Sequence, residues 1–470
     1  MRRPLPTTPG VTGSVTPTAE SVTGRESRVT HGESGLTGSA ENVSPGEAGV
    51  ARRRVLLVMR TRTYRARAFL RAARALGLDV TVATEREMPL RPRGSMLALD
   101  FDDPGQARAA VQRFADEFPI QAVVGVDDDT TVLAAHLAHA LRLPHNSLDS
   151  VKAARYKDVM RLALSEAGLL SPAFWLFSLA DHDPARAAAQ VGYPCVLKPL
   201  SLSASRGVIR ADDADQFVAA WRAIADILAE TDLPADDPGA HQVLVERFIP
   251  GSEVALEGML ADGCLRVLAL FDKPDPLDGP SFEETLYVTP SRLADHTQAA
   301  IADSVQRACD ALGLRSGPVH AEARVNEAGV WVVEVAARSI GGLCSGTLRF
   351  ESASGTSVAL EEVILAEALD PAGGPVREAR REQRPAGVMM IPAPAEGILR
   401  EVRGLSEAQA VAGVDSIEIS IPCGERVLRA PRASRYLGFI FAHADSPAEV
   451  ESALRDAHAR LQFDIQPARD

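Results

Sequence analysis

An acidic hairpin near the middle of the chain constrains the fold most strongly. Two apolar runs, residues 320–325 and 330–337, flank a turn that contains glycine, a pattern that predicts a β-hairpin. Glu322 lies in the first run and Glu334 in the second, so one site could hold both carboxylates. Burying this acid pair without a cation would be costly. With Arg338 four residues further on, the hairpin suits Mg²⁺ and phosphate, which indicates a nucleotide-dependent enzyme.

Composition narrows the class of protein. The chain has 470 residues and 46% hydrophobic content, enough for roughly three domains. Its net charge of −13 argues against a nucleic-acid partner. No apolar run reaches the roughly 18 residues that span a bilayer, so we expect no membrane partner. The five cysteines are widely spaced without a CxxC motif, which favours a reducing cytoplasm over a disulfide or zinc framework.

The first part of the chain predicts a disordered tail over residues 1–53. It is rich in Ser, Thr, Gly and Pro and has few large apolar residues, so it cannot offset the entropy of ordering. A transit peptide is the alternative interpretation. Such peptides are poor in acidic residues, whereas this segment carries five glutamates, so we favour the tail.

Residues 54–150 predict an N-terminal α/β domain. Strands are expected at 55–59, 79–83 and 122–126, and helices at 64–76, 104–118 and 129–141. This alternation implies a parallel sheet, and the absence of GxGxxG after the first strand disfavours a dinucleotide site. Three aspartates at 127–129 follow a strand, where helix capping is favoured over a substrate contact.

Residues 151–375 predict a second domain and residues 376–470 a third. A helix over 151–168 precedes a flap subdomain at about 195–250, with strands around 196 and at 243–248. Later strands are expected at 253–260, 265–271, 387–391 and 416–421, and helices at 214–230, 294–312, 357–368 and 447–461. A Pro/Gly-rich break at 370–375 separates the last two domains.

Two further segments carry residues suited to phosphate and sugar chemistry. Lys198 ends an apolar strand and could reach a phosphate, although a solvated surface lysine is the alternative. The loop 201–208 consists mostly of small residues, and its backbone N–H groups could surround an oxyanion. Glu253 and Glu257 share one face of a strand and could hold ribose hydroxyls, or they could be solvated acids of a hairpin.

Taken in chain order, the segments described above resemble the ATP-grasp superfamily, and the resemblance covers about residues 54–465. Two blocks, 334–342 and 391–402, are similar to the L-amino acid ligase-type carboxylate–amine ligases. The resemblance implies an ATP-grasp architecture of class α/β. Its parts would be an N-terminal parallel α/β domain, a two-lobed ATP-binding core and a small C-terminal α+β domain.

The resemblance also implies which residues bind ATP. They comprise two lysines on the phosphates, a mobile flap, an adenine pocket and a ribose ligand. In that order, the residues are Lys157 and Lys198; Ser203, Ser205, Arg206 and Gly207; Glu246, Phe248 and Ile249; and Glu253.

Metal and substrate roles follow from the same resemblance. Glu322 and Glu334 would bind Mg²⁺ or Mn²⁺, and Lys198 and Arg338 would be catalytic. The substrate residues would be Glu284, Tyr287, Arg338, Gly341 and Gly342. Many members of the superfamily carry Asn where this chain has Ala336, so the second metal would depend on Glu334, water and nucleotide oxygens.

The activity implied is ATP-dependent joining of a small-molecule carboxylate, most suitably an amino acid, to an amine, with a homodimer as the assembly. A carboxylase or a nucleotide-biosynthesis ligase of the same superfamily is the alternative, as is a non-catalytic ATP-binding protein. Two other side chains could be mistaken for functional residues. Cys344 is interpreted as a buried structural thiol rather than a nucleophile, and His320 as a core histidine rather than a substrate contact.

Overall fold

The computed structural model describes residues 52–86, 92–180, 182–231, 233, 237–370, 374, 376 and 378–468. The predicted disordered tail lies outside the described residues except for its last two positions. The predicted break at 370–375 is described only in part. The paragraphs below concern the compact unit that begins at Ala51.

The first described region is a four-stranded parallel sheet in the order β3-β2-β1-β4. Alternate residues of β1 face opposite sides: Leu57 packs with Phe69, and Leu56 packs with Val111. Both faces of the sheet are therefore covered, as parallel sheets require. The strands are β1 (Arg54–Val58), β2 (Asp79–Thr84), β3 (Met96–Ala98) and β4 (Ala122–Gly125), and the helices are α1 (Ala66–Ala75), α2 (Pro104–Glu117) and α3 (Thr131–Ala140).

The single helix predicted over 151–168 is wrong. The structure has two helices, α4 (Leu148–Arg155) and α5 (Lys157–Glu166), which meet at Tyr156. Tyr156 has an extended backbone, with φ −98° and ψ 116°. Neither Gly nor Pro marks this break, so the sequence pattern could not show it. The break makes Lys157 the first residue of a new helix, and its side chain is buried.

A second sheet forms a small lobe, defined here as residues 174–247. Its four strands are antiparallel in the order β5-β8-β6-β7, with α7 packed against them. The lobe begins before the predicted 195 because β5 pairs with β8 along its whole length. Its elements are β5 (Phe174–Ser178), α6 (Pro184–Ala188), β6 (Cys195–Pro199), β7 (Ile209–Ala211), α7 (Ala214–Ala229) and β8 (Gln242–Arg247).

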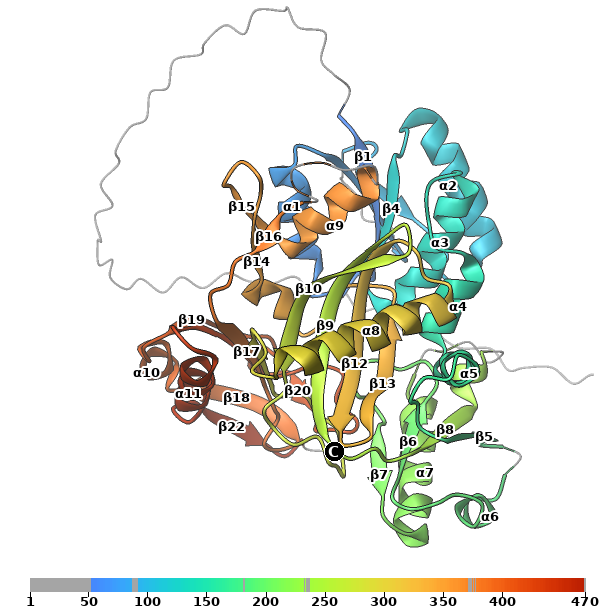
Figure 1. The fold of residues 1–470 in the computed structure, drawn as a ribbon, viewed down its shortest axis with the longest axis vertical. Coiled ribbons are helices and arrows are strands. Elements are labelled where there is room, and N and C mark those ends of the chain that lie inside the picture. Colours follow the sequence, from blue (N-terminus) through green and yellow to red (C-terminus); the bar gives the residue numbers. More distant parts are fainter. Residues whose placement is uncertain are drawn as a thin grey trace, which may run out of the picture. The chain divides into compact units, whose positions relative to one another are not determined.

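The largest sheet has eight strands in the order β13-β12-β9-β10-β11-β17-β21-β19. Helix α8 (Asp295–Leu312) crosses one face of it, and its Ile301 and Val305 pack against Leu256 and Val332 (Figure 1). The strands are β9 (Ser252–Ala261), β10 (Cys264–Asp272), β11 (Leu286–Thr289), β12 (Gly317–Asn326), β13 (Gly329–Ala336), β17 (Ala386–Ile391), β19 (Val414–Ile419) and β21 (Gly438–His443). Because β17 pairs with β11, the sheet continues from the core into the C-terminal region.

The remaining elements are short or lie at the edges. The predicted helix over 357–368 begins as a strand, β15 (Ser357–Ala359), and continues as α9 (Leu360–Leu369). The others are β14 (Arg349–Glu351), β16 (Arg380–Arg381), β18 (Gly397–Arg403), α10 (Leu405–Gln409), β20 (Arg426–Val427), α11 (Pro447–His458) and β22 (Gln462–Gln466). Six of these strands form two further antiparallel sheets, β15-β14-β16 and β20-β18-β22. With the three larger sheets, these elements confirm the predicted α/β class.

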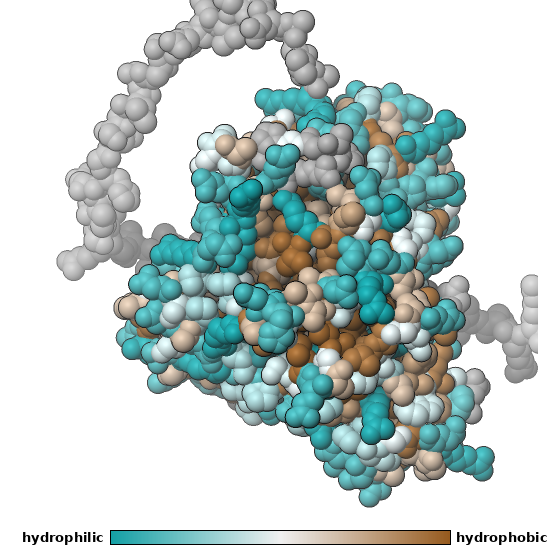
Figure 2. All heavy atoms as spheres, in the orientation of Figure 1, coloured by the Kyte–Doolittle hydropathy of each residue, from teal (hydrophilic) through white to brown (hydrophobic). Residues whose placement is uncertain are grey.

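One face of the molecule shows how hydrophilic and apolar side chains are distributed over the surface. Figure 2 shows a face that is mostly hydrophilic, with apolar patches near its middle. Among the described residues, no helix is both long and apolar enough to cross a membrane.

Candidate functional site

A cavity of about 270 Å³ lies among the small lobe, the large sheet and the carboxyl end of the first sheet. The structure gathers nearly every predicted site residue around it. The lining includes Lys157, Lys198, Ser203, Ser205, Glu246, Phe248, Ile249, Glu253, Glu284, Tyr287, Glu322, Glu334, Arg338, Gly341 and Gly342. Two predicted flap residues, Arg206 and Gly207, lie outside the lining.

Lys198 occupies the small-lobe side of the cavity, at the end of β6. Its Nζ lies 2.6 Å from one carboxylate oxygen of Glu246, and Arg161 Nε lies 2.6 Å from the other. Burial would raise the pKa of Glu246, but Arg161 and Lys198 outweigh it and lower the pKa to about 2. Glu246 was predicted to line the adenine pocket, and in this structure both of its oxygens bind cations. Its contacts therefore indicate a role in orienting Lys198.

The segment Ser203 to Ser205 forms the rim of the cavity on the same side. Ala204 and Ser205 adopt left-handed backbone conformations, with φ of +55° and +54°. Such backbone is costly for residues with a side chain and is concentrated at binding loops. Lys157 Nζ holds the segment by donating to the carbonyl of Leu202 at 3.1 Å. Gly207 instead donates its N–H to the carbonyl of Pro431 at 2.8 Å, which points it away from the cavity.

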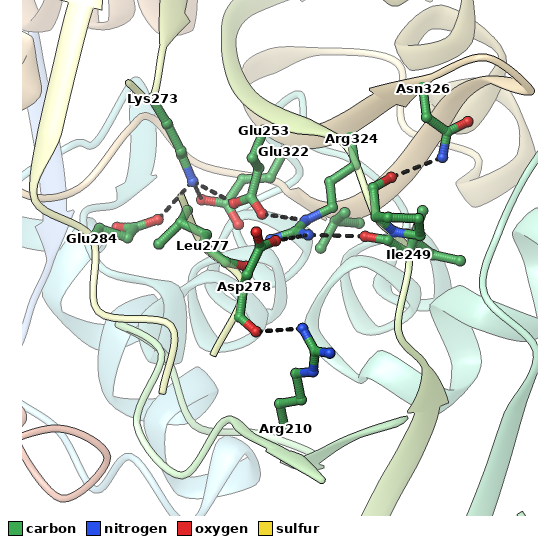
Figure 3. Close-up of polar contacts among 12 residues, drawn as sticks. Arg210, Ile249, Glu253, Lys273, Leu277, Asp278, Glu284, Glu322, Arg324 and Asn326 are labelled. Carbon is green, nitrogen blue, oxygen red and sulfur yellow. Dashed lines mark hydrogen bonds and ion pairs between the residues drawn. The ribbon is translucent and has the colours of Figure 1, made fainter. Parts of the chain in front are cut away.

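A second charge cluster lies on the large sheet and is built around Lys273, a residue that the sequence analysis missed. Lys273 Nζ lies 2.8 Å from Glu253, 2.8 Å from Glu284 and 2.7 Å from Glu322, each at an Oε1 atom (Figure 3). Arg324 also binds Glu253, at 2.8 Å. One sequence signal could have identified Lys273. Like Lys198, it follows an apolar strand and precedes a proline.

Two of the carboxylates around Lys273, those of Glu284 and Glu322, have pKa values shifted in opposite directions. Burial would raise the pKa of Glu322, but Lys273 and His320 outweigh it and hold the pKa well below its usual range. Burial raises the pKa of Glu284 to about 7. The negative charge of Glu322 contributes to this rise, whereas the positive charge of Lys273 opposes it. One oxygen from each of these two residues and one from Glu253 lie within 4.8 Å of one another, so the cluster has the composition of a cation site.

The two predicted metal ligands, Glu322 and Glu334, are direct cross-strand partners in the β12–β13 hairpin. A β-bulge follows Glu322, between it and Ala323. Glu334 Oε1 lies 3.4 Å from Lys157 Nζ. The hairpin thus brings both carboxylates to the cavity as predicted from the sequence, each beside a lysine.

Arg338 meets the first sheet at the far side of the cavity. Its Nε lies 3.5 Å from Asp128, which also contacts Arg155 at 3.1 Å. Burial would raise the pKa of Asp128, but Arg155 and Arg338 outweigh it and lower the pKa. Capping was the favoured role for residues 127–129. Asp127 is the N-cap residue of the short helical turn, and its carboxylate accepts from the Thr63 hydroxyl at 2.8 Å. All three aspartates line the cavity, and Asp128 is the one that contacts Arg338.

Gly341 and Gly342 allow the chain to pass close to Tyr64 and Met390. A Cβ on Gly342 would lie 2.6 Å from the Met390 sulfur, and its φ of +58° is a conformation that favours glycine. The Gly342 N–H donates to the Tyr64 hydroxyl at 2.9 Å. These contacts leave no room for larger side chains at this wall of the cavity.

His320 and Cys344 are both buried, and both line the cavity. His320 is buried between Glu257 and Glu322, at 3.7 Å from each, and it lines the cavity. It is therefore part of the site's charge network as well as a core residue. Burial raises the pKa of the Cys344 thiol well above its usual range, which agrees with the predicted structural thiol.

Three family models match this chain in sequence. An ATP-grasp N-terminal domain matches residues 70–145, an ATP-grasp domain matches 191–347, and an L-amino acid ligase C-terminal domain 2 matches 389–466. The chain belongs to the ATP-grasp superfamily. The middle match contains Lys198, Lys273 and both hairpin glutamates, and it covers both charge clusters except for Arg161.

Individual relatives of this ATP-grasp protein point to one branch. A crystal structure of an L-amino acid ligase from Bacillus licheniformis aligns with a TM-score of 0.69 and 27% identity, over 88% of this chain and 99% of that one. Alanine–anticapsin ligase from Bacillus amyloliquefaciens is 26% identical over 49% of this chain and 51% of its own length. Human carnosine synthase 1 is 30% identical over 44% of this chain and 26% of its own length. The chain thus spans about half the length of the first of these curated relatives and about a quarter of the second.

Proposed function

We propose that this ATP-grasp protein joins a carboxylate to an amine at the expense of ATP, most suitably on amino acids, and releases ADP and phosphate. The observation that carries the proposal is one cavity lined by the cations of Lys157, Lys198 and Arg338 together with the carboxylates of Glu284, Glu322 and Glu334. Support comes from the ligase-type C-terminal match and from the ligase relatives. We also propose three domains, at residues 54–150, 151–375 and 376–470. Composition and resemblance further suggest a homodimer located in the cytoplasm.

In the first step, a carboxylate oxygen of the substrate attacks the γ-phosphorus of ATP. A bond from oxygen to phosphorus forms, and the bond from phosphorus to the ADP oxygen breaks. Lys198 and Lys157 line the cavity where they can neutralise phosphate charge, and Arg338 can orient the transferred phosphate or the substrate carboxylate. Because Asp128 holds Arg338 at 3.5 Å, the guanidinium is positioned before substrate arrives.

Glu322 and Glu334 are the residues that would hold Mg²⁺ or Mn²⁺. Carboxylate oxygens suit these cations, and the two side chains are cross-strand partners. Lys273, His320 and Tyr287 all approach the same oxygen of Glu322, Oε1, so Oε2 is its candidate metal ligand. A bound cation would stabilise the negative charge on the phosphoryl oxygens.

In the second step, an amine nitrogen attacks the carbonyl carbon of the acyl phosphate. The bond from carbon to the phosphate oxygen breaks, phosphate leaves, and the nitrogen loses a proton. Glu284 and Tyr287 would receive the amine, and their position in the cavity lining, where the Tyr287 hydroxyl donates to Glu284 at 2.6 Å, supports this role. The Ser203 to Ser205 segment would exclude water, which otherwise hydrolyses the acyl phosphate.

The test measures phosphate release from Mg·ATP with amino acids offered singly and in pairs, and Glu334→Ala as the blank. Release that requires two amino acids, with a product of the mass of a dipeptide, supports the ligase. Release stimulated by bicarbonate without an amine would point to a carboxylase. ATP binding with no turnover against any acceptor would contradict an enzymatic role.

A further inference from the structure

A loop joins β10 to β11 over residues 273–285, and its Phe282 and Glu284 line the cavity. Its first residue is Lys273, and Glu284 stands one residue before its end. These two side chains bind each other at 2.8 Å. The loop is named the bridging loop here, because the part between its two ends contacts two different sheets.

On the large sheet, Arg324 of β12 holds the middle of the bridging loop. Its guanidinium is buried and donates to the carbonyls of Ile249 and Leu277, the second of which belongs to the loop (Figure 3). The same guanidinium binds Glu253, one of the three carboxylates around Lys273. The loop is therefore fixed to the large sheet through the residues that organise the acidic cluster.

On the small lobe, Arg210 of β7 holds the next part of the bridging loop. Its backbone N–H donates to the carbonyl of Pro280 at 2.9 Å, and its guanidinium donates to the carbonyl of Asp278 at 2.7 Å (Figure 3). Ile209 forms a bridge with Ser281. The loop therefore pairs with β7, the edge strand of the small lobe.

The contact between Arg210 and the loop is close as well as polar. A Cβ on Gly279 would lie 2.8 Å from the Arg210 Cβ, and the φ of Gly279 is +95°. The Arg210 guanidinium also lies 4.2 Å from the ring centre of Phe248, a residue of the cavity lining. The small lobe, the cavity wall and the loop thus meet at one side chain.

The small lobe also carries Lys198 and the Ser203 to Ser205 segment, which would bind the phosphates of ATP. A nucleotide that positions this lobe therefore positions Arg210 and the loop attached to it. The loop in turn carries Glu284, which would face the amine, and Lys273, which binds Glu284 at 2.8 Å. A continuous set of contacts joins the two halves of the reaction, and small displacements of reacting groups reduce rates strongly.

We propose that Arg210 is a positioning residue. It fastens the bridging loop to the small lobe, so the geometry of the amine site depends on how ATP is bound. This inference rests on the proposed ligase function. It predicts that a loosened loop allows the acyl phosphate to form but lets water compete with the amine.

The experiment compares the wild-type protein with Arg210→Ala, in amide formed per phosphate released and in the KM of each substrate. We expect the KM of the amine to rise on the order of tenfold, as for loss of a charge-assisted hydrogen bond, and amide per phosphate to fall. Merely weaker ATP binding would leave that ratio unchanged. Arg210→Lys, which keeps a cation over Phe248, should restore part of it. Arg222→Ala is the matched control, since Arg222 is exposed on α7 of the same lobe.

Gly279→Ala loosens the same contact from the loop side and guards against misfolding of the Arg210 variant. It too should lower amide per phosphate, with the KM of ATP unchanged. A ratio equal to that of wild type in both folded variants would overturn the inference. If the wild-type protein itself formed no amide, the proposed function would fail instead, so the two failures are distinguishable.

Discussion

The two buried charge clusters of the cavity carry opposite excess charge. In the first cluster, Arg161 of α5 and Lys198 of the small lobe share the single carboxylate of Glu246. On the large sheet, Lys273 is surrounded by three carboxylates, of which Glu253 also contacts Arg324 and Glu322 has the His320 ring at 3.7 Å. Counting lysine, arginine and glutamate side chains, the first cluster has one cation in excess and the second has one carboxylate in excess.

This difference shows how one cavity can bind a phosphate and a metal side by side. An excess cation attracts the phosphates of a nucleotide, whereas excess carboxylates attract Mg²⁺ or an ammonium group. Buried charges persist only when paired, so each cluster keeps an internal partner that holds its excess group in place. The predictions below alter one cluster at a time, from the largest expected effect to the smallest.

The largest effect should follow from Glu334→Gln, which removes a proposed metal ligand beside the acidic cluster. We expect turnover to fall on the order of 10²–10⁴, because positioned charge supplies most of the rate in phosphoryl transfer. Steady-state phosphate release measures it. Glu327→Gln is the control, since Glu327 is exposed in the turn of the same hairpin. Equal turnover in both variants would remove Glu334 from the metal site.

The next effect should follow from Lys273→Met, which leaves three carboxylates facing one another. Removing one partner of a buried pair costs about 3–5 kcal/mol of folding stability, and a divalent cation should recover part of it. Thermal unfolding with and without Mg²⁺ measures this recovery. We expect Mg²⁺ to raise the Tm of Lys273→Met more than that of wild type.

Lys198→Met is the matched variant in the other cluster, where Arg161 still neutralises Glu246. Its Tm should respond to Mg²⁺ no more than the wild-type value does. If Mg²⁺ stabilised the two methionine variants equally, the contrast in excess charge between the clusters would be wrong.

A smaller effect concerns acid stability and Glu246. The ordinary pKa of a glutamate is 4.5, and the folded value for Glu246 is about 2. Its ion pairs therefore stabilise fully above about pH 4.5 and lose this contribution as the pH falls toward 2. Glu246→Gln should lower stability by about 1–3 kcal/mol near pH 7, because an amide still accepts hydrogen bonds.

Urea unfolding at about pH 7 and about pH 3.5 tests this, since the difference between wild type and Glu246→Gln should shrink at the lower pH. A constant difference across that range would show that the ion pairs of Glu246 do not govern acid stability.

Much of the fold was predictable because its signals are local. The alternation in residues 54–141 predicted a parallel sheet, and β1, β2 and β4 lie within one or two residues of their predicted ranges. The helix break at Tyr156 was not predictable, since it depends on tertiary contacts rather than on Gly or Pro. The superfamily and the ligase branch predicted from spaced motifs are confirmed by the family models.

The site was predictable where a residue stands in a motif and not where its partner comes from a distant segment. Lys198, Glu322 and Glu334 follow strands or lie in them, and the cavity gathers all three. Lys273 was missed because its role depends on three glutamates from separate strands and a loop. The individual roles of the site residues remain predictions.

The central claim is that the carboxylate is activated by transfer of phosphate from ATP. The most direct measurement supplies a carboxylate labelled with oxygen-18 together with an amine and unlabelled Mg·ATP, and determines the mass of the phosphate released. The account predicts one labelled oxygen in that phosphate for each amide formed, because the attacking carboxylate oxygen leaves with phosphorus. Amide formation with unlabelled phosphate would contradict it.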